Sequence, residues 1–276
     1  MILVDSVTRL RHNIETLVIT GSHGAVYAAC VAATCGATAV IFNDAGGGRD
    51  DAGYAGLAWL DGLEIAAATV GHDTARIGDA VDTLRRGVIT HVNQTATALG
   101  CTVGKTAADA ARLLEAARPR HHAVPALREA RYLVRVGPPE VWTLDSVSLV
   151  GASDAGHIVV TGSHGGLLGG HAGEALHTDA LAAVYNDAGM GIDAAGIGRL
   201  AALDERGIVA VTVSSHSARI GDGMSTYRDG VISAVNNTSR HIGVAVGMHV
   251  PEFCDAVAAA APRASATADA MEYPRG

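Results

Sequence analysis

The sequence predicts an α/β protein built as two similar halves, each with a sheet of parallel strands. Two observations support this prediction. Short apolar runs alternate with Ala-rich helical stretches, and a series of short motifs returns in the same order in the second part of the chain. The most distinctive motif is TGSHG, which occupies residues 20–24 and again 161–165. Strands that alternate with helices are usually parallel and joined by right-handed crossovers.

Five motifs recur at a nearly constant offset. In chain order they are DSV, TGSHG, NDAG, ARIGD, and GVI followed by Asn93 or Asn236. An ordered series of this kind predicts an internal tandem duplication of a (βα)n unit, with the two halves related by a pseudo-twofold axis. We expect a first repeat over residues 1–118, a linker over 119–140, a second repeat over 141–262 and a flexible tail over 263–276.

The expected elements follow the same order in both halves. TLVIT, TAVIF and IAAATV read as buried strands in the first half, and HIVVT, LAAVY and IVAVTV in the second. GLAWLDGL and GIGRLAALDERG predict helices between the second and third of these strands. After ARIGD we expect a longer helical stretch to about Gly100 or Gly243, then a short strand (CTVG or GVAVG) and a final helix. Thr106 suits the N-cap of that helix in the first half, and Pro251 suits the first turn of its counterpart.

Composition excludes several classes of function. The chain has 276 residues and a formal net charge of -8, and so it lacks the basic surface that nucleic acid requires. Its apolar stretches are shorter than the roughly 20 residues of a membrane span. The N-terminal stretch has an early acid and no signal-peptide core, and the four cysteines form no CxxC pair. We therefore expect a cytoplasmic protein with reduced, structural thiols.

The repeated motifs are expected to meet at one edge of each sheet. TGSHG, NDAG and the segment through ARIGD each follow a predicted strand, and ligands bind outside the carboxyl ends of parallel strands. Residues needed only for packing would show apolar periodicity, whereas the shared letters are Ser, His, Asn, Asp, Arg and Gly. This composition indicates a site.

TGSHG offers a hydroxyl, an imidazole and flexible backbone. Ser22 and Ser163 are candidate nucleophiles or hydrogen-bond donors, and His23 and His164 are candidate general bases or orienting groups. Adjacent Ser and His side chains usually point apart, so a Ser from one loop paired with a His or Asp from another is favoured. The glycines leave backbone amides free to bind an anion or an oxyanion, and the candidates are Gly24, Gly165 and Gly166. The alternative is a Ser N-cap beside a packed His.

NDAG supplies acids and amides. Asp44 and Asp187 are candidate general bases, partners that orient a histidine, or oxygen ligands, and Asn43 and Asn186 are candidate substrate-binding residues. The structural alternative is an Asx turn. The nearby Asp50 and Asp193 are expected to cap the helices that follow them.

ARIGD supplies the expected anion clamp. The guanidinium groups of Arg76 and Arg219 can bind a carboxylate in a bidentate manner, with Asp79 and Asp222 holding them in place. The alternative is an internal Arg–Asp pair that ties the two halves together. Just upstream, His216 is a further catalytic candidate, and His72 occupies an adjacent rather than an identical position in the first half.

The candidate residues together predict a small-molecule enzyme. We expect a hydrolase that acts on an amide, imide or ester bond of a small carboxylate-bearing metabolite, with Ser, His and Asp in catalysis and Arg on the substrate anion. A cofactor-independent isomerase or lyase working by proton transfer and a non-catalytic small-molecule binding protein are the alternatives. Two α/β halves around a cleft resemble amino-acid racemases in architecture alone, because the paired catalytic cysteines of that family have no counterpart here.

No cofactor or macromolecular partner is expected. The sequence contains neither a GxGxxG dinucleotide fingerprint nor a phosphate loop, a zinc helix motif or a GxSxG nucleophile turn. We expect catalysis without a tightly held metal, although the 13 histidines leave a dispersed metal site open. The expected partner is a small anionic metabolite, not nucleic acid or a membrane. The oligomeric state is left open, with a homo-oligomer among the possibilities.

Overall fold

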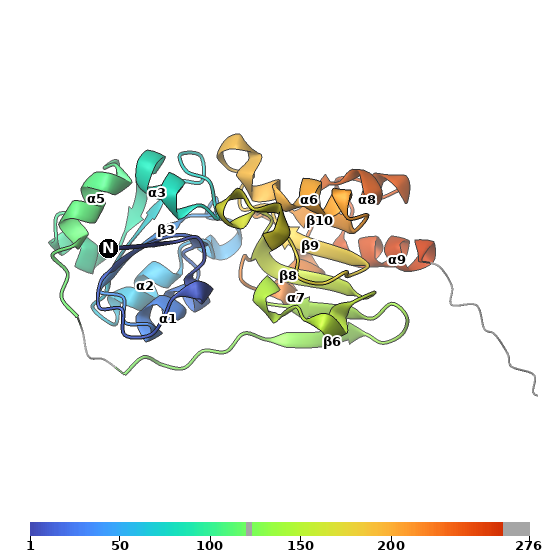
Figure 1. The fold of residues 1–276 in the computed structure, drawn as a ribbon, viewed down its shortest axis with the longest axis horizontal. Coiled ribbons are helices and arrows are strands. Elements are labelled where there is room, and N and C mark those ends of the chain that lie inside the picture. The colour runs from blue at the N-terminus through green and yellow to red at the C-terminus, as the bar shows by residue number, and fades with distance from the viewer. Residues whose placement is uncertain (120–122, 262–276) are drawn as a thin grey trace, which may run out of the picture.

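The computed structural model describes residues 1–119 and 123–261, and the expected tail at 263–276 lies outside the described residues. Two α/β units lie side by side, and the segment that joins them runs along one side of the molecule (Figure 1). Each unit contains one sheet, of five strands in the first and six in the second. The predicted α/β class is confirmed, and the sheets are mixed but mostly parallel.

The first sheet has the strand order β1-β2-β3-β4-β5. Its first four strands pair in parallel, and β5 pairs antiparallel with β4. The strands are β1 (Ile2–Val4), β2 (Leu17–His23), β3 (Ala39–Asn43), β4 (Ala66–Val70) and β5 (Ile89–Val92).

The second sheet has the order β11-β10-β9-β8-β7-β6. The strands β7 to β10 are parallel to one another, whereas β6 and β11 form antiparallel edges. The strands are β6 (Arg131–Arg135), β7 (Val141–Leu144), β8 (Ile158–His164), β9 (Ala182–Asn186), β10 (Val209–Val213) and β11 (Ile232–Val235). Because β6 lies within 119–140, the segment expected to be a linker also contributes one edge of this sheet.

Helices cover both faces of each sheet, because alternate strand residues are apolar on both sides. In the first unit, Val18 and Val40 pack toward α1 and α2, while Ile19 and Ile41 pack toward α5. The second unit repeats this arrangement with α6 on one face and α9 on the other. The helices are α1 (Val26–Thr34), α2 (Gly56–Asp61), α3 (Ala80–Arg86), α4 (Gln94–Ala98), α5 (Ala107–Leu114), α6 (Arg199–Glu205), α7 (Gly223–Asp229), α8 (Asn237–His241) and α9 (Val250–Ala260).

The chain after ARIGD differs from the prediction. The expected long helix is broken into α3, the antiparallel strand β5 and the short helix α4, and the second unit follows the same order with α7, β11 and α8. The Asn93 side chain accounts for the break. Its Oδ1 accepts hydrogen bonds from the backbone N–H of both Ala67 and Ala96, which fixes β4 beside the start of α4. The predicted short strands at CTVG and GVAVG are wrong, because these residues form turns before the final helices.

The helix ends were easier to predict. Thr106 caps α5 by accepting a hydrogen bond from the Asp109 N–H, and Pro251 lies in the first turn of α9. All four cysteines are buried and unpaired. Across residues 1–119 and 123–261, every helix is too short or too polar to cross a lipid bilayer.

Candidate functional site

The two units meet through the loops at the carboxyl ends of their parallel strands. The NDAG turns touch each other, since a Cβ on Gly46 would lie 2.9 Å from the Gly189 Cα. Beside this contact, Ala45, Ile77, Ala188 and Ile220 form a small buried apolar cluster with members from both units. The interface is therefore formed by the same motifs from each side.

TGSHG packs closely against ARIGD within each unit. The Gly78 N–H donates to the Gly21 carbonyl at 2.8 Å, and a Cβ on Gly21 would lie 2.3 Å from the backbone nitrogen of Asp79. The second unit repeats this approach, where a Cβ on Gly162 would lie 2.4 Å from the Asp222 nitrogen. Only glycine allows two backbone segments to come this close.

Each TGSHG histidine also reaches across the interface. A Cβ on Gly78 would lie 3.4 Å from His164 Cε1, and a Cβ on Gly221 would lie 3.6 Å from His23 Cε1. The two imidazole rings face each other edge to face, with centroids 6.4 Å apart. The sequence-predicted loops of the two halves thus converge on one place.

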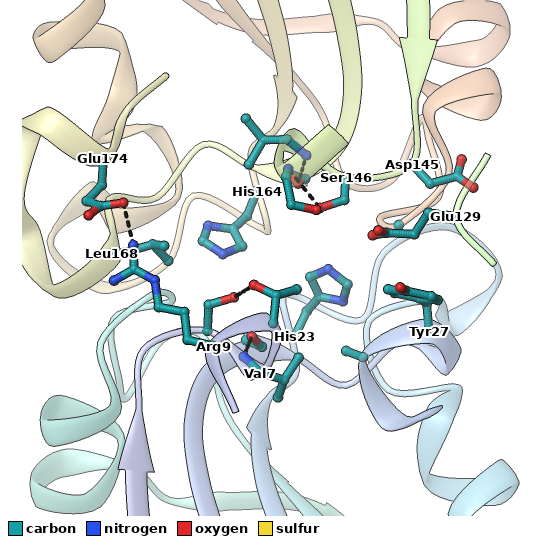
Figure 2. Close-up of a pocket in the computed structure, with 18 of the residues that line it drawn as sticks. Val7, Arg9, His23, Tyr27, Glu129, Asp145, Ser146, His164, Leu168 and Glu174 are labelled. Carbon is teal, nitrogen blue, oxygen red and sulfur yellow. Dashed lines mark hydrogen bonds and ion pairs between the residues drawn. The ribbon is translucent and has the colours of Figure 1, made fainter. Parts of the chain in front are cut away.

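A cavity of about 140 Å³ lies at this convergence, and Figure 2 shows its walls. Ser22, His23, Ser163 and His164 line it, so four of the predicted catalytic residues share one site. At roughly 30 Å³ per water molecule, this volume corresponds to about five waters, and so to a small ligand. The other polar lining residues are Ser6, Thr8, Arg9, Tyr27, Glu129, Asp145, Ser146, Ser148, Glu174, His177 and Arg199.

Backbone hydrogen bonds fix the tautomer of both central histidines. His23 Nδ1 accepts from the Ala25 N–H at 3.3 Å, and His164 Nδ1 accepts from the Gly166 N–H at 3.2 Å. In the neutral ring the proton is then on Nε2, which makes both side chains hydrogen-bond donors.

Desolvation disfavours the charged form of both rings, of which His164 is buried and His23 is half-buried. Desolvation lowers the pKa of His23 to about 4. It also lowers the pKa of His164 well below its ordinary value, and the positive charges of Arg199 and of a protonated His23 would lower it further. Two neutral N–H donors in a partly enclosed cavity suit a carbonyl oxygen that develops negative charge.

The two serines occupy equivalent positions and bond to the DSV motif. Ser22 Oγ accepts from the Val7 N–H at 3.0 Å, and Ser163 Oγ accepts from the Val147 N–H at 2.8 Å. Within the part of the chain that the structure describes, neither serine is hydrogen-bonded to a histidine. Each hydroxyl therefore retains its own proton to donate to a ligand.

Carboxyl groups occupy one end of the cavity, where Figure 2 shows Glu129, Asp145 and Tyr27 close together. Burial, followed by the charge of Asp145, raises the pKa of Glu129 against the opposing effect of hydroxyl groups from Ser146, Tyr27 and Ser148. Burial also raises the pKa of Asp145. A raised pKa makes a carboxylate a stronger base, which suits it to general acid–base catalysis.

Arginines occupy the other end. Arg9 of the first unit forms an ion pair with Glu174 of the second, on the opposite side of the histidines from Glu129 (Figure 2). The buried Arg199 guanidinium donates to the carbonyls of Gly166, Glu174 and Ala175 and lies 5.3 Å from the Tyr185 ring centroid. The cavity therefore has a cationic end and a carboxylic end.

The NDAG residues lie outside the cavity lining. Asp44 Oδ1 accepts from the Gly46 N–H at 3.0 Å, as in the Asx turn considered above, and contacts His72 Nδ1 at 3.0 Å. The hydrogen bond to Asp44 and the negative charge of its carboxylate raise the pKa of His72, because both favour the protonated imidazole. Asp187 accepts from the N–H groups of Gly189 and Ser215.

The asparagines of NDAG are buried and fix neighbouring loops. Asn43 donates to the Ala75 carbonyl at 3.0 Å, and Asn186 donates to the Ala218 carbonyl at 3.1 Å. Each holds the start of the ARIGD motif in its own unit. These contacts occupy both side-chain amides.

The ARIGD arginines also lie away from the cavity lining. Arg76 pairs with Asp193 at 2.7 Å, and Arg219 pairs with Asp50 at 2.9 Å, so each arginine binds an aspartate of the opposite unit. Their side chains are 47% and 41% exposed. The arginines therefore form Arg–Asp ion pairs that join the two halves, which was the alternative to an anion clamp. These pairs lie at the surface and not in the interior. Asp50 and Asp193, expected to be helix caps, are the partners.

The remaining candidates have backbone roles or are exposed. Gly24 and Gly165 donate their N–H groups to the Asn43 and Asn186 carbonyls. The Gly166 N–H is the donor to His164. His216 is exposed and is not among the lining residues.

Several lining residues were not among the predicted site residues. Ser6 and Ser146 belong to DSV, the first repeated motif, and each is hydrogen-bonded to the hydroxyl two residues later at 2.8 Å. Recurrence of this motif was the signal that could have identified them. Glu129 and Arg199 lie in segments without a repeated counterpart of the same residue type, so repetition could not reveal them.

The described residues include no group of three or more His, Cys, Asp or Glu side chains arranged to hold a metal ion. No family model matches this chain, and neither the curated proteins nor the solved structures contain a significant match to it.

Proposed function

We propose that the protein is an enzyme that hydrolyses an amide, imide or ester bond of a small carboxylate-bearing metabolite bound between the two units. The observation that carries this proposal is the pair of neutral histidines, His164 buried and His23 half-buried, whose Nε2–H groups are available to the cavity. Preorganised donors stabilise a developing oxyanion most strongly where water is largely excluded. Each such donor typically contributes about 100-fold or more to kcat.

In this proposal the histidines bind the carbonyl oxygen, and the serine hydroxyls bind the substrate. The Nδ1 hydrogen bonds disfavour the tautomer that a histidine base would need, and the serines lack a histidine partner among the described residues. We therefore assign attack on the carbonyl carbon to water. The Glu129 carboxylate accepts the proton of that water as the C–O bond forms, and returns it to the nitrogen or oxygen of the leaving group as the scissile bond breaks.

Proton transfer without hydrolysis is the second candidate. The raised pKa of Glu129 favours it, because a carboxyl group of this kind can remove a proton next to a carbonyl and return it elsewhere. The same histidines would then stabilise an enolate. An isomerase or lyase would need no attacking water.

Isotope labelling separates these candidates. The protein would be incubated with succinamate, monomethyl succinate and 2-oxoglutarate, first in H₂¹⁸O and then in D₂O, with product detection by mass spectrometry. Hydrolysis places ¹⁸O in the released carboxylate, whereas proton transfer places deuterium on carbon of 2-oxoglutarate above the uncatalysed rate. Saturable binding with neither label would indicate a binding protein.

A matched pair of variants tests the role of the histidines. The double variant His23→Gln and His164→Gln should lose about 100-fold or more in kcat, because both oxyanion donors are removed. His216→Gln changes an exposed histidine outside the cavity lining and should retain activity. Equal activity in the two variants would contradict the proposal.

We also infer that the two units arose by duplication of one ancestral unit. We further infer that the protein works in the cytoplasm and binds small anionic metabolites. Equivalent hydrogen bonds support the duplication, including Val7 to Ser22 and Val147 to Ser163. Four buried, unpaired cysteines support a reducing compartment.

A further inference from the structure

We infer that Arg199 binds a carboxylate group of the ligand, so that the ligand lies with its carboxylate at the arginine end of the cavity and its reacting carbonyl toward Glu129. This inference rests on the proposed function in one respect, the position of the reacting carbonyl. The carboxylate contact itself is argued from the charges and packing around Arg199.

Arg199 is 1% exposed and lines the cavity. Its hydrogen bonds go to neutral groups, namely three backbone carbonyls and the Tyr185 side chain, and it forms no ion pair with a carboxylate of residues 1–119 or 123–261. Glu174, the acid close enough to act on its charge, is already paired with Arg9. A buried charge without a counter-ion is costly, and an anionic ligand in the cavity would supply one.

The equivalent position in the first unit carries no such charge. Gly56 donates its N–H to the Gly24 carbonyl, as Arg199 donates its N–H to the Gly165 carbonyl. A Cβ on Gly56 would lie 2.7 Å from the Ala29 Cβ, so α1 fills the space that a side chain would need. In the second unit, 3-10 turns at Leu168–Gly170 and Ala172–Glu174 follow TGSHG in place of that helix. The second unit alone therefore provides both the arginine and the space for it.

The rest of the cavity agrees with this orientation. The other acids of the lining, Glu129 and Asp145, lie at the far side of the histidines from Arg9 and Glu174 (Figure 2). A carboxylate beside Glu129 would be repelled, whereas one beside Arg199 leaves the histidine donors to the reacting carbonyl. Because Nε and Nη1 of Arg199 donate to backbone carbonyls, the contact with the ligand carboxylate is made by Nη2 and by the positive charge of the guanidinium.

Binding measurements without turnover test the inference. Isothermal titration calorimetry at pH 7.5 and constant ionic strength would compare acetate, malonate, succinate and glutarate with succinamide, the neutral counterpart of succinate. We expect saturable binding of at least one dicarboxylate, and binding of succinamide weaker by about tenfold or more. Absence of saturable binding by every carboxylate, or equal binding of succinamide, would overturn the inference.

Variants then assign the contact to Arg199. Arg199→Gln should weaken carboxylate binding by about tenfold or more, and Arg199→Lys should weaken it less, because lysine retains the positive charge. Arg206→Gln is the matched control, since Arg206 also holds carbonyls of this loop, those of Leu176 and Thr178, but does not line the cavity. Equal effects of Arg199→Gln and Arg206→Gln would mean that Arg199 only supports the loop.

Glu174→Gln keeps the test decisive even if Arg199→Gln does not fold. It removes the acid nearest to Arg199 and releases Arg9, so we expect carboxylate binding to tighten by about threefold or more. Unchanged or weaker binding would overturn the inference. These binding measurements need no turnover, so a negative result in the isotope-labelling experiment would not affect them. Unaltered carboxylate binding in the Arg199 variants, together with observed hydrolysis, would contradict this inference but not the proposed function.

Discussion

Replacing His23 with glutamine should remove a large part of the acid sensitivity of the fold. Its pKa in the folded protein is about 4, against 6.5 for an unperturbed histidine, because the ring is desolvated. Below pH 6.5 the unfolded chain therefore binds a proton that the folded chain does not. The free energy of unfolding thus decreases as the pH is lowered, until about pH 4. The lowered pKa corresponds to about 3 kcal/mol when fully developed, of which about 2 kcal/mol is present at pH 5.

The assay is denaturant unfolding at pH 7.5 and pH 5 for the wild type, His23→Gln and His216→Gln. We expect the free energy of unfolding to fall by about 2 kcal/mol less in His23→Gln than in the wild type across this interval. The exposed His216→Gln variant should follow the wild type. Carboxylates that titrate in the same range are common to all three proteins and cancel in the comparison. If His23→Gln loses as much stability as the wild type, the ring is not held neutral by burial and the argument for a neutral donor fails.

Three further outcomes are expected. Arg76→Lys and Arg219→Lys should each lower the free energy of unfolding by about 1 kcal/mol or less in denaturant melts, since exposed ion pairs contribute little. A much larger loss would indicate a buried tie. Gly21→Ala should destabilise the fold by about 1–3 kcal/mol or more, because the new Cβ meets backbone, whereas Gly151→Ala, in extended backbone with nothing within 4 Å, should be nearly neutral in the same melts. Glu129→Gln should lower kcat by about 100-fold or more under either catalytic proposal, and retained turnover would remove it from the mechanism.

Local sequence was sufficient for the central parallel strands, but it missed the parallel strands β1 and β7 and was poor for the segments after ARIGD. The runs around β2 to β4 and β8 to β10 are apolar on both faces. This pattern is typical of parallel strands that are covered by helices on both sides. The strand β5 was missed although three of its four residues are β-branched, because four residues are too few to show a period and a helix was expected across them. Hydrogen bonds from Asn93 to distant residues decide the outcome there.

The repeat identified the loops of the site but not the roles of their residues. The sequence left open whether the two halves share one site, and the structure places Ser22, His23, Ser163 and His164 around one cavity. The repeat gave equal weight to Arg76 and Arg219, which the structure places in exposed ion pairs between the units. A motif retained to join two halves and a motif retained to bind a ligand look the same in a sequence, since both need polar residues at fixed positions.

The sequence by itself determined the α/β class, the order of the repeated motifs and the strand ends where polar residues gather, because periodicity and turn chemistry are local properties of the chain. The tertiary structure decided which loops face each other, which histidine nitrogen is a donor, and which arginine lies at the cavity. These outcomes depend on contacts such as Arg199 with the Glu174 carbonyl and His164 with Gly78, which form only when the units pack together. Burial then sets the charge of the two histidines, and no sequence pattern encodes burial between distant loops.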